Sequence, residues 1–240
     1  MKYILKLPKF SDRDLSIVEK ELDDLLAESN NRVEELAKTP NPTWENFIFE
    51  LDLVSDKVQR FFSPIRHLNS VMNSDEVRAV HNACLPKLSA WFTDFGQNQS
   101  VYEKVQQLKE SAAFSELDHG QQKSIEDQLR GFKLGGVALE ENEKARFKEI
   151  ALELSNLGTR FQENILDSTR AWHKTLTSAS ALAGFPQSSL EGARLAAKEH
   201  NDEGYRLTLD YPSFHSVMTF ADDRELRPVS YTHLTLPTKA

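Results

Sequence analysis

The sequence contains no proline between Pro86 and Pro186, and this gap restricts its fold more than any other feature. Proline ends or kinks helices because it lacks a backbone N–H and its ring clashes with the preceding turn. Glycine, which also weakens helices, accounts for only 9 of the 240 residues. This share is well below the usual glycine content of proteins, which is about 7%. The middle of the chain can therefore form long helices.

Apolar residues recur every three or four positions through most of the chain, which is the period of an amphipathic helix. Breaks and capping residues divide this pattern into segments. Asn41-Pro42 ends the first segment, Thr43 caps the second, and Ser63-Pro64 ends it. The pattern predicts helices over 14–38, 43–63, 75–96 with a kink near Pro86, 100–108 opened by a Ser100–Glu103 capping box, 121–132 and 141–170.

The last of these segments predicts the longest helix, about 45 Å at 1.5 Å per residue. Its apolar residues are expected to face inward: Phe147, Ile150, Leu154, Leu157, Phe161 and Ile165.

The carboxyl-terminal part has a different pattern. His173–Leu176 and the alternating Tyr205–Leu209 predict two short strands, with a helix over Gln187–Glu199 between them. Pro212-Ser213 opens a last short helix through Phe220. The whole pattern predicts an all-α protein, an elongated helical bundle with one or two short β-strands near the carboxyl end.

Charge and composition exclude several classes of partner. The 29 basic and 37 acidic residues are interspersed and give a net charge of -8, which repels a phosphate backbone. No run approaches the ~18 apolar residues of a membrane span, and lysines interrupt Met1–Phe10, so no secretory signal is expected. A single cysteine agrees with a reducing compartment. We expect a cytoplasmic protein that binds neither nucleic acid nor membrane.

A helical zinc peptidase needs two histidines four residues apart, with a glutamate beside the first that acts as a base on metal-bound water. No two histidines of this sequence have that spacing, as their positions show: 67, 81, 119, 173, 200, 215 and 233. We expect no metal site and no catalytic residue, although a metal site built from distant positions is the less favoured alternative. The sequence names no substrate-binding residue.

Several single residues are candidates for a functional site. His67 lies in a link between predicted helices, where a hydrogen bond within a turn is favoured over a ligand contact. His119 lies at a helix entry, which suits capping better than catalysis. Cys84 falls on an apolar stripe, so a packed thiol is favoured over a reactive one. An aromatic groove for peptides is less favoured than core packing for these residues: Phe61-Phe62, Trp91-Phe92 and Phe95.

Two further patterns have an ordinary structural interpretation. Glu149 and Glu153 lie one helical turn apart and could act as paired carboxylates, yet Arg146 and Lys148 beside them favour a solvated, salt-bridged face. Gly135-Gly136 lacks the spacing of a phosphate-binding loop and follows no predicted strand, so it is interpreted as a helix stop.

Longer motifs are specific enough to compare with known families. They are Pro42-Thr-Trp-Glu-Asn-Phe47, Phe62-Ser-Pro-Ile-Arg-His-Leu-Asn-Ser-Val71, Ile150-Ala-Leu-Glu-Leu-Ser-Asn-Leu-Gly158, Asn164-Ile-Leu-Asp-Ser-Thr169 and Gly204-Tyr-Arg-Leu-Thr-Leu-Asp-Tyr-Pro-Ser213 followed by Val217-Met-Thr-Phe220. Together they resemble the thimet oligopeptidase-like zinc metallopeptidase family, over roughly residues 1 to 227.

The resemblance implies a mostly helical, two-lobed enzyme whose zinc, held by a His-Glu-x-x-His helix and a further glutamate, serves to hydrolyse short peptides. Those ligands lie far downstream in the family. Residues 1–228 thus resemble the amino-terminal lobe alone, a scaffold and channel wall that binds no zinc, is inactive by itself and has the carboxyl-terminal catalytic region as partner. The alternative is a stand-alone, non-catalytic helical module that binds a peptide or a protein.

The resemblance ends after Arg227. Residues 229–240 are similar to a translated transposon adaptor of the kind used in sequencing-library preparation, and are interpreted as a non-native tail. A natural polar tail is the alternative. A lobe without its catalytic region would also leave apolar surface exposed, so we expect self-association or binding of a hydrophobic dye.

Overall fold

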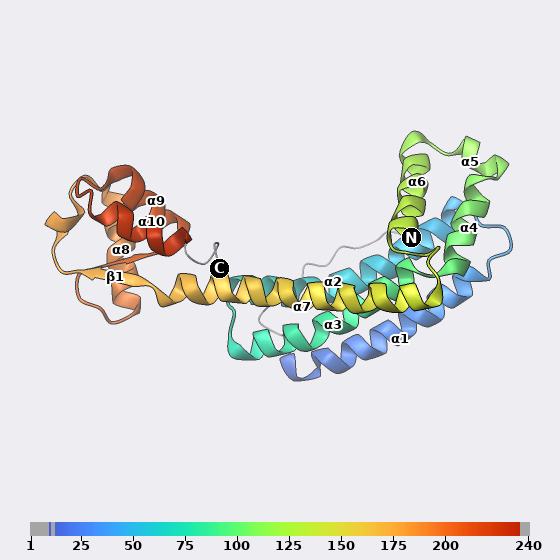
Figure 1. Ribbon diagram of the computed structural model, residues 1–240, viewed down its shortest axis with the longest axis horizontal. Coiled ribbons are helices and arrows are strands. Elements are labelled where there is room, and N and C mark those ends of the chain that lie inside the picture. Colours follow the sequence, from blue (N-terminus) through green and yellow to red (C-terminus); the bar gives the residue numbers. More distant parts are fainter. Residues whose placement is uncertain (1–9, 11–12, 236–240) are drawn as a thin grey trace. The chain divides into compact units, whose positions relative to one another are not determined.

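The structure is a computed structural model that describes residue 10 and residues 13–235, with side chains through residue 231. Helices dominate this part of the chain, and two short strands form its sheet, which confirms the all-α class with short strands near the carboxyl end. The chain divides into two compact units, Met1–Asn156 and Leu157–Ala240 (Figure 1). None of the helices described is long and apolar enough to cross a membrane.

Unit 1 begins with a single 3-10 turn, η1 (Leu15–Ile17), which leads into α1 (Val18–Ala37). Asp14 caps this start, because its Oδ1 accepts a hydrogen bond from the backbone N–H of Ser16 at 2.9 Å. The buried residues of α1 follow the predicted helical period: Val18, Leu22, Leu25, Ser29, Val33 and Leu36. The predicted helix over 14–38 is confirmed.

The second helix begins at the predicted cap. Thr43 and Asn46 form a capping box, in which the Asn46 N–H donates to Thr43 Oγ1 at 3.2 Å and the Thr43 N–H donates to Asn46 Oδ1 at 2.8 Å. A π-helical turn, η2 (Trp44–Ile48), then leads into α2 (Phe49–Val71).

The predicted end of this helix at Ser63-Pro64 is wrong, because Pro64 lies inside α2. A proline inside a helix costs about 3 kcal/mol. The residues that follow it, Ile65 and Leu68, are buried in the core. Full burial of such a side chain contributes about 1.5–3 kcal/mol, so continuing the helix offsets the cost of the proline.

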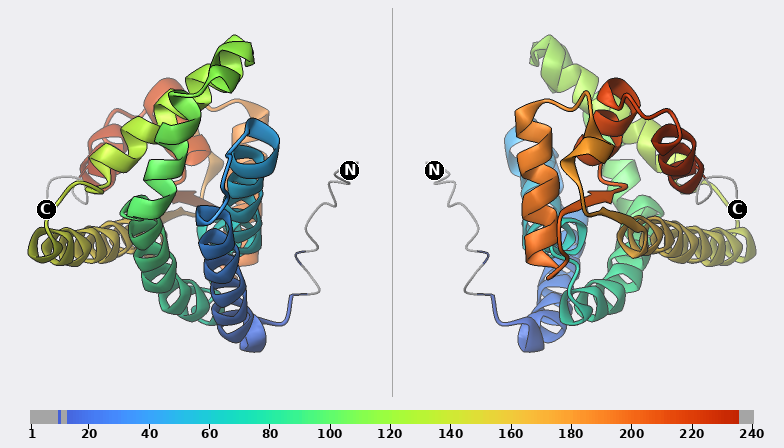
Figure 2. Two further views of the ribbon diagram at one scale, coloured as in Figure 1. Left: turned by 90° about the vertical axis from the view of Figure 1, so that its right-hand side faces the viewer. Right: turned by 90° about the vertical axis from the view of Figure 1, so that its left-hand side faces the viewer.

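The third helix, α3 (Asp75–Gly96), confirms the prediction over 75–96. Ser74 caps it, since Ser74 Oγ accepts a hydrogen bond from the Val77 N–H at 3.3 Å. Pro86 again lies within the helix. Figure 2 shows α1, α2 and α3 side by side, and Trp91 Nε1 of α3 donates to Asn30 Oδ1 of α1 at 2.8 Å.

Three shorter helices follow: α4 (Gln99–Lys109), α5 (Ala112–Glu116) and α6 (His119–Leu134). The predicted capping box at Ser100 is wrong. Asn98 is the cap instead, because its Oδ1 accepts a hydrogen bond from the Val101 N–H at 3.0 Å, and α4 therefore begins before Ser100. The sequence analysis missed α5, which is too short to show a period.

The Gly135-Gly136 pair ends α6, as predicted. The Val137 N–H donates to the Phe132 carbonyl at 3.0 Å and the Gly136 N–H donates to the Lys133 carbonyl at 3.2 Å. This is the Schellman arrangement, and it requires the positive φ of 88° at Gly136 that glycine adopts without strain.

The longest helix, α7 (Glu141–Ala171), has the predicted length but not the predicted burial. None of its residues is buried, and the expected inward stripe is largely exposed at Ile150, Leu154, Leu157 and Phe161. The expectation of an inward face is therefore wrong for these four residues, because apolar periodicity marks one side of a helix and does not determine what packs against it. The boundary between the two units falls inside α7.

Unit 2 contains the sheet. Strands β1 (His173–Leu176) and β2 (Tyr205–Thr208) pair antiparallel, with His173 opposite Thr208 and Leu176 opposite Tyr205. A 3-10 turn, η3 (Ala179–Leu182), and α8 (Gln187–Glu199) connect them, and α9 (Tyr211–Phe220) follows. Both strands and both helices were predicted. The unit has its own small core: Leu182, Phe185, Ala193, Leu207, Val217, Ala221 and Leu226.

A last helix, α10 (Leu226–Thr235), was not expected from the sequence. It crosses the boundary proposed between residues 228 and 229. Leu226 is 4% exposed and Ser230 is 2% exposed, so this helix packs against the unit. Its packing does not test the origin of residues 229–240, of which 236–240 lie outside the described residues.

Candidate functional site

The two candidate histidines lie on helices. His67 lies inside α2 rather than in a link between helices, so its interpretation as a turn residue is wrong. The continuation of α2 past Pro64 is the reason, and the His67 ring centroid lies 5.4 Å from that of Phe10. His119 is the first residue of α6, where Asp118 provides the cap by accepting the Gln121 N–H at 2.9 Å.

Glu149 of α7 lies on a salt-bridged face, as predicted, whereas Glu153 is exposed and forms no ion pair with another residue whose side chain the structure describes. Arg146 Nη1 lies 2.9 Å from Glu149 Oε2, and Lys148 Nζ lies 2.7 Å from Asp94 Oδ1 of α3. Both glutamates of the candidate pair are exposed. Carboxyl groups that act as general acids or bases are typically buried in a cleft, and these two lie on an open surface.

The thiol and the candidate aromatic groove belong mainly to the core. Cys84 is fully buried, and burial raises the pKa of its thiol to about 11, with Glu19 adding to the shift. Phe62 and Trp91 are buried as well. Phe92 alone of the five aromatic residues is markedly exposed, at 38%. The core interpretation is therefore confirmed for the other four aromatic residues and for Cys84, and is wrong for Phe92.

Zinc does not fit the residues of this chain that the structure describes. No three His, Cys, Asp or Glu side chains among them are grouped so that they could hold a metal ion. The described histidine side chains are divided among α2, α3, α6, β1, α9 and the end of α8. No catalytic step through a metal can be derived from this arrangement.

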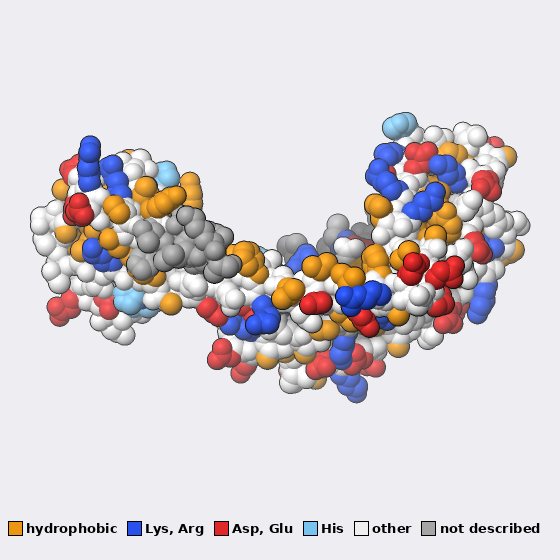
Figure 3. All heavy atoms as spheres, viewed as in Figure 1, with side chains coloured by type: hydrophobic (Ala, Val, Ile, Leu, Met, Phe, Trp, Pro, Cys, Tyr) orange, Lys and Arg blue, Asp and Glu red, His pale blue; other side chains and the backbone are white. Residues whose placement is uncertain are grey.

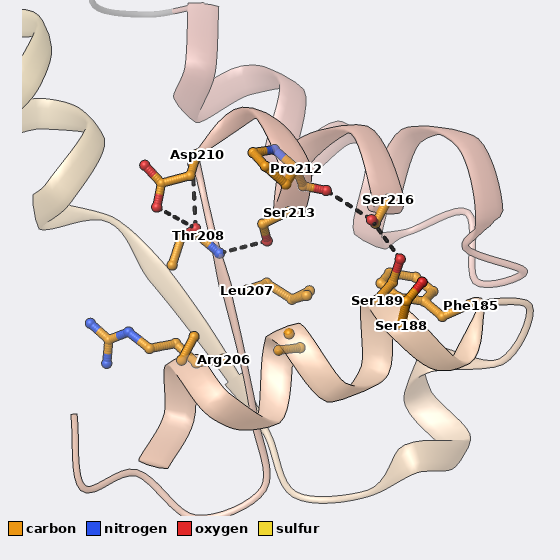
Figure 4. Close-up of a pocket in the computed structure, with 13 residues that line it drawn as sticks. Phe185, Ser188, Ser189, Arg206, Leu207, Thr208, Asp210, Pro212, Ser213 and Ser216 are labelled. Atoms are coloured by element: carbon orange, nitrogen blue, oxygen red, sulfur yellow. Dashed lines mark hydrogen bonds between the residues drawn. The ribbon is translucent and has the colours of Figure 1, made fainter. Parts of the chain in front are cut away.

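A pocket of about 450 Å³ lies in unit 2 between α8, β2 and the start of α9 (Figure 4). Its walls combine apolar side chains with five hydroxyl groups, from Ser188, Ser189, Thr208, Ser213 and Ser216. The sequence did not indicate this pocket, because hydroxyl side chains on three separate elements have no spacing that would reveal it.

Hydrogen bonds join the residues of the pocket to one another. The Thr208 N–H donates to Ser213 Oγ at 2.9 Å, Ser216 Oγ donates to the Pro212 carbonyl at 2.8 Å, and the Ser189 and Ser216 hydroxyls lie 3.0 Å apart. Arg206 pairs with Asp202, and in Figure 4 its guanidinium points away from the serines. The lining residues include no His, Cys or Lys, the side chains that most often activate a hydroxyl or act as nucleophiles themselves.

Four exposed apolar side chains lie along α7. We call Ile150, Leu154, Leu157 and Phe161 the α7 apolar face, and they are 41%, 64%, 49% and 50% exposed. Figure 3 shows hydrophobic side chains along α7 with charged side chains beside them. Exposed apolar surface of this extent marks a contact surface rather than a catalytic site.

Comparison with known proteins identifies the family. The model of the N-terminal domain of neurolysin and thimet oligopeptidase matches residues 22–144. The chain is 40% identical to oligopeptidase A of Haemophilus influenzae over 225 residues, and 38% identical to oligopeptidase A of Escherichia coli over 227 residues. Each match covers 94% of this chain and 33% of the relative.

A more distant relative agrees. The chain is 30% identical over 231 residues to an Arabidopsis thaliana protein named "Probable cytosolic oligopeptidase A", which covers 93% of this chain and 33% of that protein. The chain thus spans about a third of the length of these curated relatives. On the family model and these identities, the chain belongs to the neurolysin/thimet oligopeptidase family and corresponds to its N-terminal part.

Proposed function

We propose that this chain is the amino-terminal scaffold and channel wall of a cytoplasmic zinc metalloendopeptidase that degrades short peptides. The observation that carries the proposal is the match of 94% of the chain to one third of oligopeptidase A from two bacteria. A similarity that spans nearly the whole chain supports a shared fold and a shared place in a longer enzyme. The name of the Arabidopsis relative supports a cytosolic location.

We also propose that the chain alone hydrolyses no peptide. Its 240 residues contain no His-Glu-x-x-His motif. The described residues offer no group of three metal ligands. Zinc and the chemistry that it supports would then belong to a carboxyl-terminal region, which is the partner of this lobe.

The test is to amplify the intact source DNA across the codons for residues 220–240 and to sequence the frame onward without adaptors. The proposal expects a frame that departs from the sequence near residue 228 and continues to a His-Glu-x-x-His segment. This result would also identify residues 229–240 as a non-native tail.

A natural stop codon directly after residue 240 would contradict both statements. The chain would then be a stand-alone helical module that binds a peptide or a protein, and the pocket of unit 2 would be the first place to look for that ligand.

A further inference from the structure

We draw no further inference here: the strongest candidate, the hydroxyl-lined pocket of unit 2 between α8, β2 and the start of α9, carries none because nothing in the structure shows what fills or covers it in a chain that spans about a third of its relatives' length.

Discussion

Cys84 shows how burial sets the chemistry of a single side chain. The thiol is fully buried in α3, and the loss of solvation raises its pKa from 9.0 to about 11. A thiolate therefore does not form in the folded protein near neutral pH. We predict that Ellman's reagent at pH 8 modifies Cys84 only after denaturant is added. Rapid modification of the native chain would contradict this placement.

The same shift has a consequence for stability. Between pH 9 and about pH 11 the unfolded chain releases the thiol proton while the folded chain retains it. The free energy of unfolding must then fall as the pH rises through this range. A Cys84→Ala variant lacks this contribution, and its unfolding free energy should fall less over the same range.

Asp52 of α2 is a second acid whose surroundings alter its pKa. Burial raises the pKa of its carboxyl group, and Gln128 Nε2 donates to Asp52 Oδ1 at 3.2 Å. When the pKa of an acid is higher in the folded protein, the protonated group stabilises the fold at a pH below the pKa of the unfolded chain. This contribution to the free energy of unfolding is lost as the pH rises through the pKa of the folded protein. We predict that Asp52→Asn raises the free energy of unfolding at pH 7, with little effect at pH 3.

Urea denaturation at the two pH values measures this difference. Asp24→Asn on the exposed surface of α1 is the control and should change neither value. A loss of stability at pH 7 in Asp52→Asn would contradict the interpretation, because it would mean that the charge stabilises the fold.

At the scale of elements, glycines with positive φ hold the turns of unit 2. Gly204 has a φ of 89°, and a Cβ there would collide with the carbonyl oxygen of Leu176 across the sheet. We predict that Gly204→Ala lowers the free energy of unfolding by at least about 2 kcal/mol. Gly192 of α8 is the matched control, because a Cβ there would meet nothing within 4 Å.

Gly192→Ala should instead raise stability by about 1 kcal/mol, since alanine favours the helix over glycine. Thermal unfolding of the two variants compares them directly. Similar losses in both would show that the turn at Gly204 does not constrain the sheet.

Local sequence predicted the elements whose ends are fixed by local hydrogen bonds. Thr43 caps a helix and the Gly135-Gly136 pair ends another where the sequence indicated. Prediction from sequence failed where tertiary packing determines the end of a helix. Helix α2 continues through Pro64 because the residues that follow it are buried in the core. The burial of α7 failed for the opposite reason: periodicity marks an apolar face but does not reveal whether anything covers it.

At the scale of the molecule, each unit has a core of its own. The smaller unit buries less surface and should be the less stable. We predict two transitions in calorimetry, of which the lower belongs to residues 157–240. Leu207→Ala should lower only that transition, and Leu22→Ala only the other, each at a cost of about 2–5 kcal/mol. A single transition that both variants shift equally would contradict independent cores.

Sequence patterns indicated some features of the candidate sites and not others. Residue patterns correctly indicated a packed Cys84 and a salt-bridged face at Glu149. They gave no sign of the hydroxyl-lined pocket, because Ser189 and Ser216 meet only through the fold. The family was recognisable from motifs many residues long, since these preserve an order of side chains that single spacings do not.

The central claim is that this chain belongs to a zinc peptidase but does not contain its catalytic centre. The most direct measurement is the zinc content of the purified 240-residue chain, with hydrolysis of a short fluorogenic peptide assayed on the same sample after zinc is added. The account predicts no stoichiometric zinc and no cleavage above the buffer control. A chain that retains one zinc ion and cleaves the peptide would contradict it.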